Sequence, residues 1–170
     1  MADNYLEFSE TLNDLKEQEE AWLKNQLEVI CVFGDKQYTE KELPDGLDPK
    51  NAKWIGCRAY QDMEAYVSFL YETAGFEYEF CGDGDQERYL WVCSREGAEV
   101  DRVAHLVQKF LQEFRPDQCW SLTYAWTCSK LRVGEFSGGA IFVTAAEIKW
   151  QNADEFVQQQ RTAFEQESNG

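Results

Sequence analysis

Two stretches of the chain alternate strictly between aromatic or large apolar residues and polar or small ones. In residues 76–80, three aromatic residues alternate with Glu77 and Glu79, and residues 119–127 repeat the pattern over a longer run. A period of two residues is typical of a β-strand with one face on the core and the other in solvent. We therefore expect an antiparallel sheet with one solvated face, which carries Glu77, Glu79, Ser121 and Thr123.

Other segments carry apolar residues at the helical spacing of 3.6 residues per turn. They predict helices over residues 15–27, over about 100–114 before Pro116, and from Ala153 to about Glu165. Short apolar strands around glycine-containing turns predict three hairpins, at residues 29–39, 76–93 and 133–143. In the last hairpin, Val133 to Phe136 is read as a strand and residues 137–139 as the turn.

Two segments stay undecided. Residues 54–74 fit a strand in their first part and a helix in the rest. Residues 145–151 are open between strand and helix, because Asn152 caps a helix that starts after it while Thr144 and Glu147 form a competing capping box.

The fold expected from this order is a single α+β domain over residues 1–170, a mainly antiparallel sheet of hairpins with helices packed on one face. The length of 170 residues and the 44% apolar content fit one domain with a sizeable core. Residues 1–10 and 166–170 are expected to fray. No secretory signal or membrane-spanning run is visible, and the six cysteines form no C-x-x-C pair, so we expect a cytoplasmic protein with free thiols.

The chain is strongly acidic, with 32 Asp and Glu against 16 Lys and Arg and a net charge of −16. Direct binding to nucleic acid or to anionic membranes is therefore not expected. The charge is uneven: residues 1–30 carry −6 and residues 61–101 carry −9, whereas residues 102–149 carry +2. The negative field therefore comes mainly from the first predicted helix and from the region around the hairpin at about residues 76–95.

No catalytic residue, metal site or cofactor site is predicted. The single histidine, His105, falls on the solvent side of its helix beside Asp101, where a surface ion pair is the simpler interpretation. The acidic run that starts at Asp83 fails the register of a calcium loop, since Arg88 stands where glycine is needed. The glycine-rich segment 134–139 lacks the Lys-Ser/Thr of a phosphate loop.

The segment from about residue 102 to 150 resembles small acidic bacterial hypothetical proteins. Three stretches carry the resemblance, namely RVAHLVQKF (102–110), CWSLTY (119–124) and GGAIFVT (138–144). This group has no assigned function, and the resemblance transfers no catalytic motif. It implies a bacterial or phage origin.

Two functions of different classes fit these patterns. The first is a non-catalytic inhibitor or binding protein of the immunity-protein or DNA-mimic type, which presents carboxylates to a basic nuclease or other DNA-binding protein. Its acidic ridge comprises Glu77, Glu79, Asp83, Asp85 and Glu87, reinforced by Glu17, Glu19 and Glu20. The second is a small-molecule binding module or small enzyme with an aromatic pocket of Trp120, Tyr124 and Trp126 between sheet and helices. A solubilising acidic surface and an ordinary core explain the same residues without function, and the oligomeric state is left open.

Overall fold

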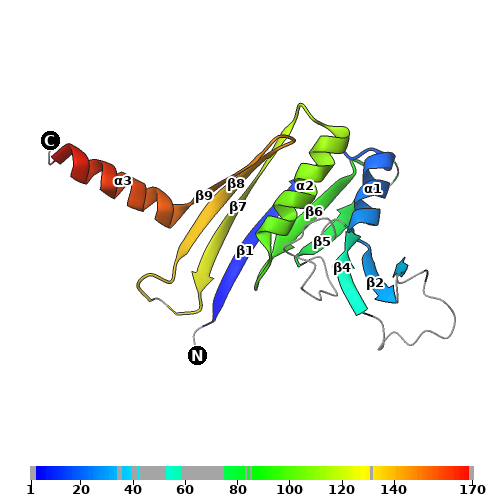
Figure 1. The fold of residues 1–170 in the computed structure, drawn as a ribbon, viewed down its shortest axis with the longest axis horizontal. Coiled ribbons are helices and arrows are strands. Elements are labelled where there is room, and N and C mark those ends of the chain that lie inside the picture. The colour runs from blue at the N-terminus through cyan, green and yellow to red at the C-terminus, as the bar shows by residue number, and fades with distance from the viewer. Residues whose placement is uncertain are drawn as a thin grey trace.

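The computed structural model describes residues 3–33, 36–39, 42, 53–58, 75–82, 84, 86–130 and 132–168. In these residues, antiparallel strands form a six-stranded sheet in the order β5-β6-β1-β7-β8-β9 and a three-stranded sheet in the order β3-β2-β4 (Figure 1). The first two helices lie on one face of the larger sheet and the third extends away from it, and this mixture of antiparallel sheet and helices confirms the α+β class. The strands are β1 (Asn4–Leu12), β2 (Val29–Phe33), β3 (Lys36–Thr39), β4 (Lys53–Cys57), β5 (Glu77–Cys81), β6 (Tyr89–Ser94), β7 (Cys119–Cys128), β8 (Ser137–Thr144) and β9 (Ile148–Asn152). The helices are α1 (Glu17–Leu27), α2 (Val100–Phe114) and α3 (Ala153–Ser168).

The first strand, β1, lies in the middle of the six-stranded sheet. It pairs antiparallel with β6 on one side and with β7 on the other (Figure 1). The prediction of fraying is therefore wrong for residues 4–10, which belong to this strand, while residues 1–2 lie outside the described residues. Leu6, Phe8 and Leu12 point into the core. Glu10 occupies the position on the same side of the strand between Phe8 and Leu12, so it interrupts the alternation of apolar and polar residues.

The helices α1 and α2 bury one face of this sheet. The α2 helix spans the predicted residues and ends at Phe114, with Arg115 as its C-cap directly before Pro116. Trp22 of α1 packs edge-on against Phe114 of α2, with ring centroids 5.7 Å apart. The core beneath them contains apolar residues from both helices and from β1, β6, β7 and β8, so one continuous cluster connects the layers.

The β7–β8 hairpin differs from the predicted one. Gly138 and Gly139 lie inside β8, opposite Ala125 and Tyr124, whereas Val133 lies in the turn. The predicted strand over 133–136 and the predicted turn over 137–139 are therefore wrong. Adjacent glycines are typical of turns, but in this sheet they provide space for neighbouring groups.

The undecided segment 145–151 resolves as a turn followed by β9. The Thr144 hydroxyl accepts a hydrogen bond from the Glu147 amide at 3.1 Å, and the Thr144 amide donates to the Glu147 carbonyl at 2.9 Å. The competing capping box is thus a β-turn between β8 and β9. The capping atom of α3 is Asn152 Oδ1, which accepts from the Asp154 amide at 2.8 Å, as predicted.

The last helix, α3, leaves the sheet and extends away from it (Figure 1). Side chains 153–166 are all exposed. The helix continues to Ser168, beyond the expected start of fraying at residue 166, while residues 169–170 lie outside the described residues.

Several predictions fall partly or wholly on residues that the structure does not describe. The strand predicted at the start of segment 54–74 is present as β4, and residues 59–74 lie outside the described residues. Residues 34–35 within the predicted first hairpin, residues 43–52, and Asp83 and Asp85 also lie outside them.

Candidate functional site

The edge strand β5 carries two of the predicted carboxylates on the face of the sheet opposite the core. Glu77 lies across from Cys93 of β6, and Glu79 lies across from Trp91. Both glutamates are exposed, whereas Phe80, which points the other way, packs against the core. Glu77 and Glu79 therefore project into solvent, as their alternation predicts.

The central strand β1 adds a third carboxylate to this face. Ser9 lies across from Cys93, and Glu7, two residues earlier, shares its face. Glu7 is exposed, and its Oε2 accepts a hydrogen bond from Thr127 Oγ1 of β7 at 3.0 Å. Sequence reasoning missed Glu7 because it treated the N-terminal residues as frayed. We call Glu7, Glu77 and Glu79 the outer acidic face.

The negative charges of the outer acidic face act on the thiol of Cys93, which lies on β6, the strand between β5 and β1. Cys93 Sγ donates to Glu77 Oε2 at 3.8 Å, and the pKa of Cys93 is raised, first by burial and then by the negative charge of Glu77. Arg95 pulls this pKa in the opposite direction. None of the three glutamates forms an ion pair with a lysine or arginine in the described part of the chain. Their carboxylates are thus available to an external cation.

The acidic residues of α1 lie on the other side of the sheet. Lys24 Nζ of α1 stands 5.1 Å from the centre of the Phe80 ring, and Phe80 points away from the outer acidic face. The helix α1 therefore adds no carboxylate to the sheet face that carries Glu77 and Glu79. The sequence predicts an acidic helix and a strand with alternating acids, but it does not say whether the two lie on the same side of the sheet.

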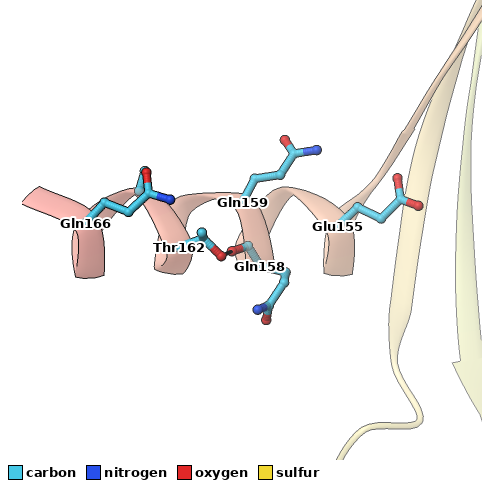
Figure 2. Close-up of a pocket in the computed structure, with 6 residues that line it drawn as sticks. Glu155, Gln158, Gln159, Thr162 and Gln166 are labelled. Carbon is cyan, nitrogen blue, oxygen red and sulfur yellow. Dashed lines mark hydrogen bonds between the residues drawn. The ribbon is translucent and has the colours of Figure 1, made fainter.

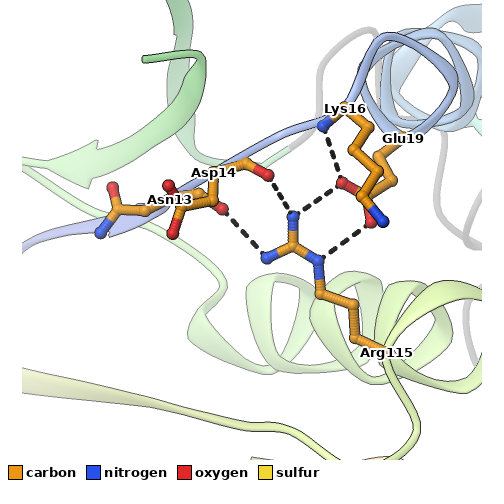
Figure 3. A network of polar contacts seen from close by, with 5 residues as sticks. All are labelled: Asn13, Asp14, Lys16, Glu19 and Arg115. Carbon is orange, nitrogen blue, oxygen red and sulfur yellow. Dashed lines mark hydrogen bonds and ion pairs between the residues drawn. The ribbon is translucent and has the colours of Figure 1, made fainter.

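Glu19 is not a surface residue at all, since only 3% of it is exposed. Its carboxylate accepts from Arg115 Nη2 at 2.7 Å, from Arg115 Nε at 3.0 Å and from the Lys16 amide at 2.8 Å (Figure 3). Arg115 also donates to the carbonyls of Asn13 and Asp14, at 3.0 and 2.7 Å. The hydrogen bonds from Arg115 lower the pKa of Glu19. The prediction that Glu19 belongs to a binding surface is wrong, and its role is to join α1 to the end of α2.

Glu20 is also neutralised within the protein. It forms an ion pair with Lys24, one turn later on α1, and a longer one with Arg88 at 3.4 Å. A carboxylate with two cationic neighbours adds little to a negative surface. Glu20 therefore contributes less to partner binding than its sequence position suggests.

Glu17 and Glu87 lie together beside the β5–β6 turn. They line an open hollow of about 440 Å³ to which Arg88 also contributes. Asp83 and Asp85, the acids predicted between these groups, lie outside the described residues. The described carboxylates of the predicted ridge thus form two groups, the outer acidic face and this smaller mixed-charge hollow.

The aromatic row of the alternative hypothesis is divided between core and surface. Trp120 is buried, and its Nε1 donates to the Thr11 carbonyl at 2.9 Å. Tyr124 is half-buried over Gly139, and Trp126 is exposed. Trp120, Tyr124 and Trp126 line neither the hollow beside the β5–β6 turn nor the hollow along α3. The three side chains of the row thus differ in burial, from buried Trp120 through half-buried Tyr124 to exposed Trp126.

A second hollow runs along α3, and all of its lining side chains come from that helix (Figure 2). They are Glu155, Gln158, Gln159, Thr162, Ala163 and Gln166. No other element opposes them in the described part of the chain. Because a ligand site must enclose much of its ligand, this open helical surface is not a small-molecule site.

His105 is partly buried instead of fully solvated as predicted. Burial lowers its pKa, Lys109 acts in the same direction, and Asp101 opposes both. The neutral imidazole is therefore favoured more than in a solvated histidine. No nucleophile is placed against His105 by any hydrogen bond among the described residues.

The described residues contain no cluster of three His, Cys, Asp or Glu side chains arranged to hold a metal ion. No helix among them has the length and apolar character needed to cross a bilayer. Comparisons of this chain with known protein families, with curated proteins and with solved structures found no match.

Proposed function

We propose that the protein is a non-catalytic binding protein whose outer acidic face docks against a basic protein of the kind that processes nucleic acid. The observation that supports this is the set of three exposed carboxylates, Glu7, Glu77 and Glu79, on a sheet face opposite the core. No described lysine or arginine pairs with them. A cationic partner would supply the missing counter-charges.

The spacing of these carboxylates suits a cationic surface built to follow a nucleic-acid backbone. Glu77 and Glu79 are two residues apart on one strand and so lie roughly 7 Å from each other, whereas Glu7, two strands away and two residues out of register with Glu77, lies roughly 12 Å from it. A DNA strand carries one phosphate per roughly 3.4 Å of axis, so the outer acidic face is a sparser array of the same sign. It would occupy part of a phosphate-binding cleft and exclude the nucleic acid from it.

The whole-molecule charge of −16 supports the same proposal through the rate of association. Long-range attraction to a basic partner raises the association rate, and this attraction weakens as salt increases. Rim carboxylates then fix the orientation of the complex. Binding that is strong at low salt and weak at high salt is therefore expected.

The test compares two variants that remove the same charge from different places. E77Q/E79Q neutralises part of the outer acidic face, and E113Q/D117N neutralises two exposed acids at the end of α2 and just after it. Each protein is immobilised and used to capture partners from a lysate at low and at high salt. Captured basic proteins are then competed with duplex DNA.

We expect the wild-type protein and E113Q/D117N to retain a basic protein that salt and duplex DNA release. E77Q/E79Q should bind that protein about tenfold more weakly, since two exposed ion pairs together contribute about 1–2 kcal/mol. Equal retention by both variants would contradict the proposal. A partner that DNA does not displace would limit the function to protein binding without nucleic-acid mimicry.

A further inference from the structure

The short segment between β1 and α1 holds a residue in a costly backbone conformation. Residues 13–16 form this segment, which we call the hinge. Asp14 has a φ of 55°, and it is the one non-glycine residue with a positive φ in the described part of the chain. Residues with a Cβ rarely adopt this left-handed conformation, although aspartate tolerates it better than most. The path from β1 to α1 therefore carries a conformational cost at Asp14.

Hydrogen bonds from other parts of the molecule keep the hinge in this path. Arg115 donates to the Asn13 carbonyl at 3.0 Å and to the Asp14 carbonyl at 2.7 Å (Figure 3). The Leu15 amide donates to the Arg88 carbonyl at 2.8 Å. These bonds oppose the cost at Asp14, so the path of the hinge depends on a balance between strain and attachment.

The strand before the hinge forms its ladders with elements that are distant in the sequence. Residues 8–12 of β1 pair with residues 90–94 of β6, and residues 4–7 pair with residues 125–128 of β7. The strand also brings its own buried apolar side chains to the core. Because the hinge is what connects β1 to the elements that follow it, an identical chain could supply the same strand with the same contacts.

We propose that β1 is exchanged between two copies of this chain, so that β6 and β7 of each copy hold β1 of the other. An exchange of this kind preserves the contacts of the closed chain and changes mainly the hinge, so it is a low-cost route to a dimer. An extended hinge releases Asp14 from the left-handed conformation but gives up the hydrogen bonds from Arg115. Four extended residues span at most about 14 Å, so the two copies lie close together at their hinges.

The exchange makes the outer acidic face a composite of two chains. Glu7 lies on β1, whereas Glu77 and Glu79 lie on β5. In the exchanged dimer, each outer acidic face therefore combines Glu77 and Glu79 of one copy with the partner's Glu7. The inference does not depend on the proposed function, because it rests on the hinge and on the register of β1.

One new cysteine in β1 can trap the exchanged strand. Ser9 lies directly opposite Cys93 of β6 in the ladder. The Thr11 carbonyl accepts from Trp120 of β7 at 2.9 Å, so Ser9 and Thr11 direct their backbone groups away from β6. Such non-hydrogen-bonded pairs have Cα atoms about 4.5 Å apart, within the range of a disulfide. When S9C is oxidised with glutathione disulfide, position 9 should therefore bond to Cys93 of the same chain if it is closed, or of the other chain after exchange.

Two hinge variants shift the balance in opposite directions while both remove the carboxylate of Asp14. S9C/D14V should favour exchange, since a β-branched residue fits the left-handed conformation of the closed hinge poorly. We expect its dimerisation constant to rise about tenfold for each hinge, and thus about a hundredfold for the two hinges of a dimer. S9C/D14G should dimerise less than S9C, because glycine adopts a positive φ without steric cost.

Each full-length protein is incubated in the reduced state over a range of concentrations, then oxidised and separated on a non-reducing gel, with peptide mapping of the linked positions. For S9C we expect the closed product of 19.8 kDa and a product of twice that mass, linked through positions 9 and 93, whose share rises with concentration. The variant S9C/C93S cannot form this link, so it reports disulfides between other cysteines.

The outcomes separate exchange from a closed monomer. Links within one chain only, at every concentration, would overturn the proposal, and so would equal shares of the doubled product in S9C/D14G and S9C/D14V. Circular dichroism checks that each variant is folded. If S9C/D14V does not fold, the comparison of S9C with S9C/D14G decides, because a doubled product that D14G leaves undiminished does not depend on the hinge.

Discussion

The ion pair between Glu19 and Arg115 joins the first turn of α1 to the C-cap residue of α2. Arg115 satisfies the carbonyls of Asn13 and Asp14 as well, so one guanidinium fixes the segment between β1 and α1 (Figure 3). Its Cζ also stands 5.1 Å from the centre of the Phe110 ring. A buried pair with several hydrogen bonds fixes geometry more than it adds stability, but loss of one partner is costly.

We predict that Glu19→Gln lowers the free energy of unfolding by about 3 kcal/mol at neutral pH, because Arg115 loses its counter-charge. The pKa of Glu19 in the folded protein lies below its ordinary value of 4.5. The carboxylate therefore contributes stability above pH 4.5, and that contribution is lost as the pH falls through the lowered folded value. Urea unfolding across this range should show the two proteins converging in acid.

The control is Glu17→Gln, a change at an exposed position of the same helix. Its unfolding free energy should stay within about 0.5 kcal/mol of wild type at every pH. If Glu19→Gln lowers the free energy of unfolding by the same amount at every pH, the loss comes from packing and not from charge.

The sequence does contain a signal for the burial of Glu19. The spacing of four residues places Glu19 in line with Leu15, Leu23 and Leu27, which form the buried side of the segment. Its partner Arg115 is distant in sequence, so no local pattern reveals what compensates the charge. A charged residue on an apolar stripe is therefore better interpreted as one half of a buried pair than as part of a surface.

At the scale of elements, the β7–β8 hairpin depends on two glycines inside a strand. A Cβ on Gly139 would lie 2.6 Å from the Gln151 carbonyl oxygen and 2.6 Å from Tyr124 Oη. The carbonyl belongs to β9 and cannot move without disturbing the ladder. Gly139 thus permits β7, β8 and β9 to approach one another where α3 begins.

We predict that Gly139→Ala lowers the free energy of unfolding by about 2 kcal/mol, since the added methyl group overpacks the strand contact. Thermal and urea unfolding would measure the loss. Gly97→Ala provides the matched control, because a Cβ at Gly97 meets nothing within 4 Å. If both substitutions are neutral, the crowding at Gly139 is absent in solution.

Elements with a regular hydrophobic period were predictable, and those defined by turn chemistry were not. The α2 helix and the β5–β6 hairpin follow from their spacing alone. The β7–β8 turn was misplaced because the Ser137-Gly138-Gly139 motif is typical of turns, and β9 stayed undecided because Thr144 and Glu147 fit both a helix cap and a β-turn. Of the candidate site, the outward orientation of Glu77 and Glu79 was predictable from alternation, whereas Glu7 depended on recognising β1.

At the scale of the whole molecule, β1 holds the two halves of the large sheet together. The β5–β6 pair lies on one side of it and the β7–β8–β9 unit on the other. Without β1, the strands β6 and β7 would each expose an unpaired edge. The N-terminal residues are therefore structural, although their sequence shows only a short and interrupted alternation.

We predict that deletion of residues 1–12 abolishes cooperative unfolding. The deletion removes Leu6, Phe8 and Leu12 from the core, at roughly 3 kcal/mol each, against a typical domain stability of about 5–15 kcal/mol. Circular dichroism during thermal unfolding would test this. Deletion of residues 166–170, at the end of the exposed α3, should leave the transition within a few degrees of wild type.

The central position of β1 also sets an order of events during synthesis. Its partner β7 is made more than one hundred residues later, since Leu6 pairs with Trp126. At about 5–20 residues per second, roughly 5–25 s pass on the ribosome before that pairing can form. During this interval the nascent β1 has no partner on its β7 side, and the sheet closes only when most of the chain has emerged. Prematurely terminated chains that lack β7 would therefore expose the apolar side of β1, which makes them ready substrates for chaperones and proteases.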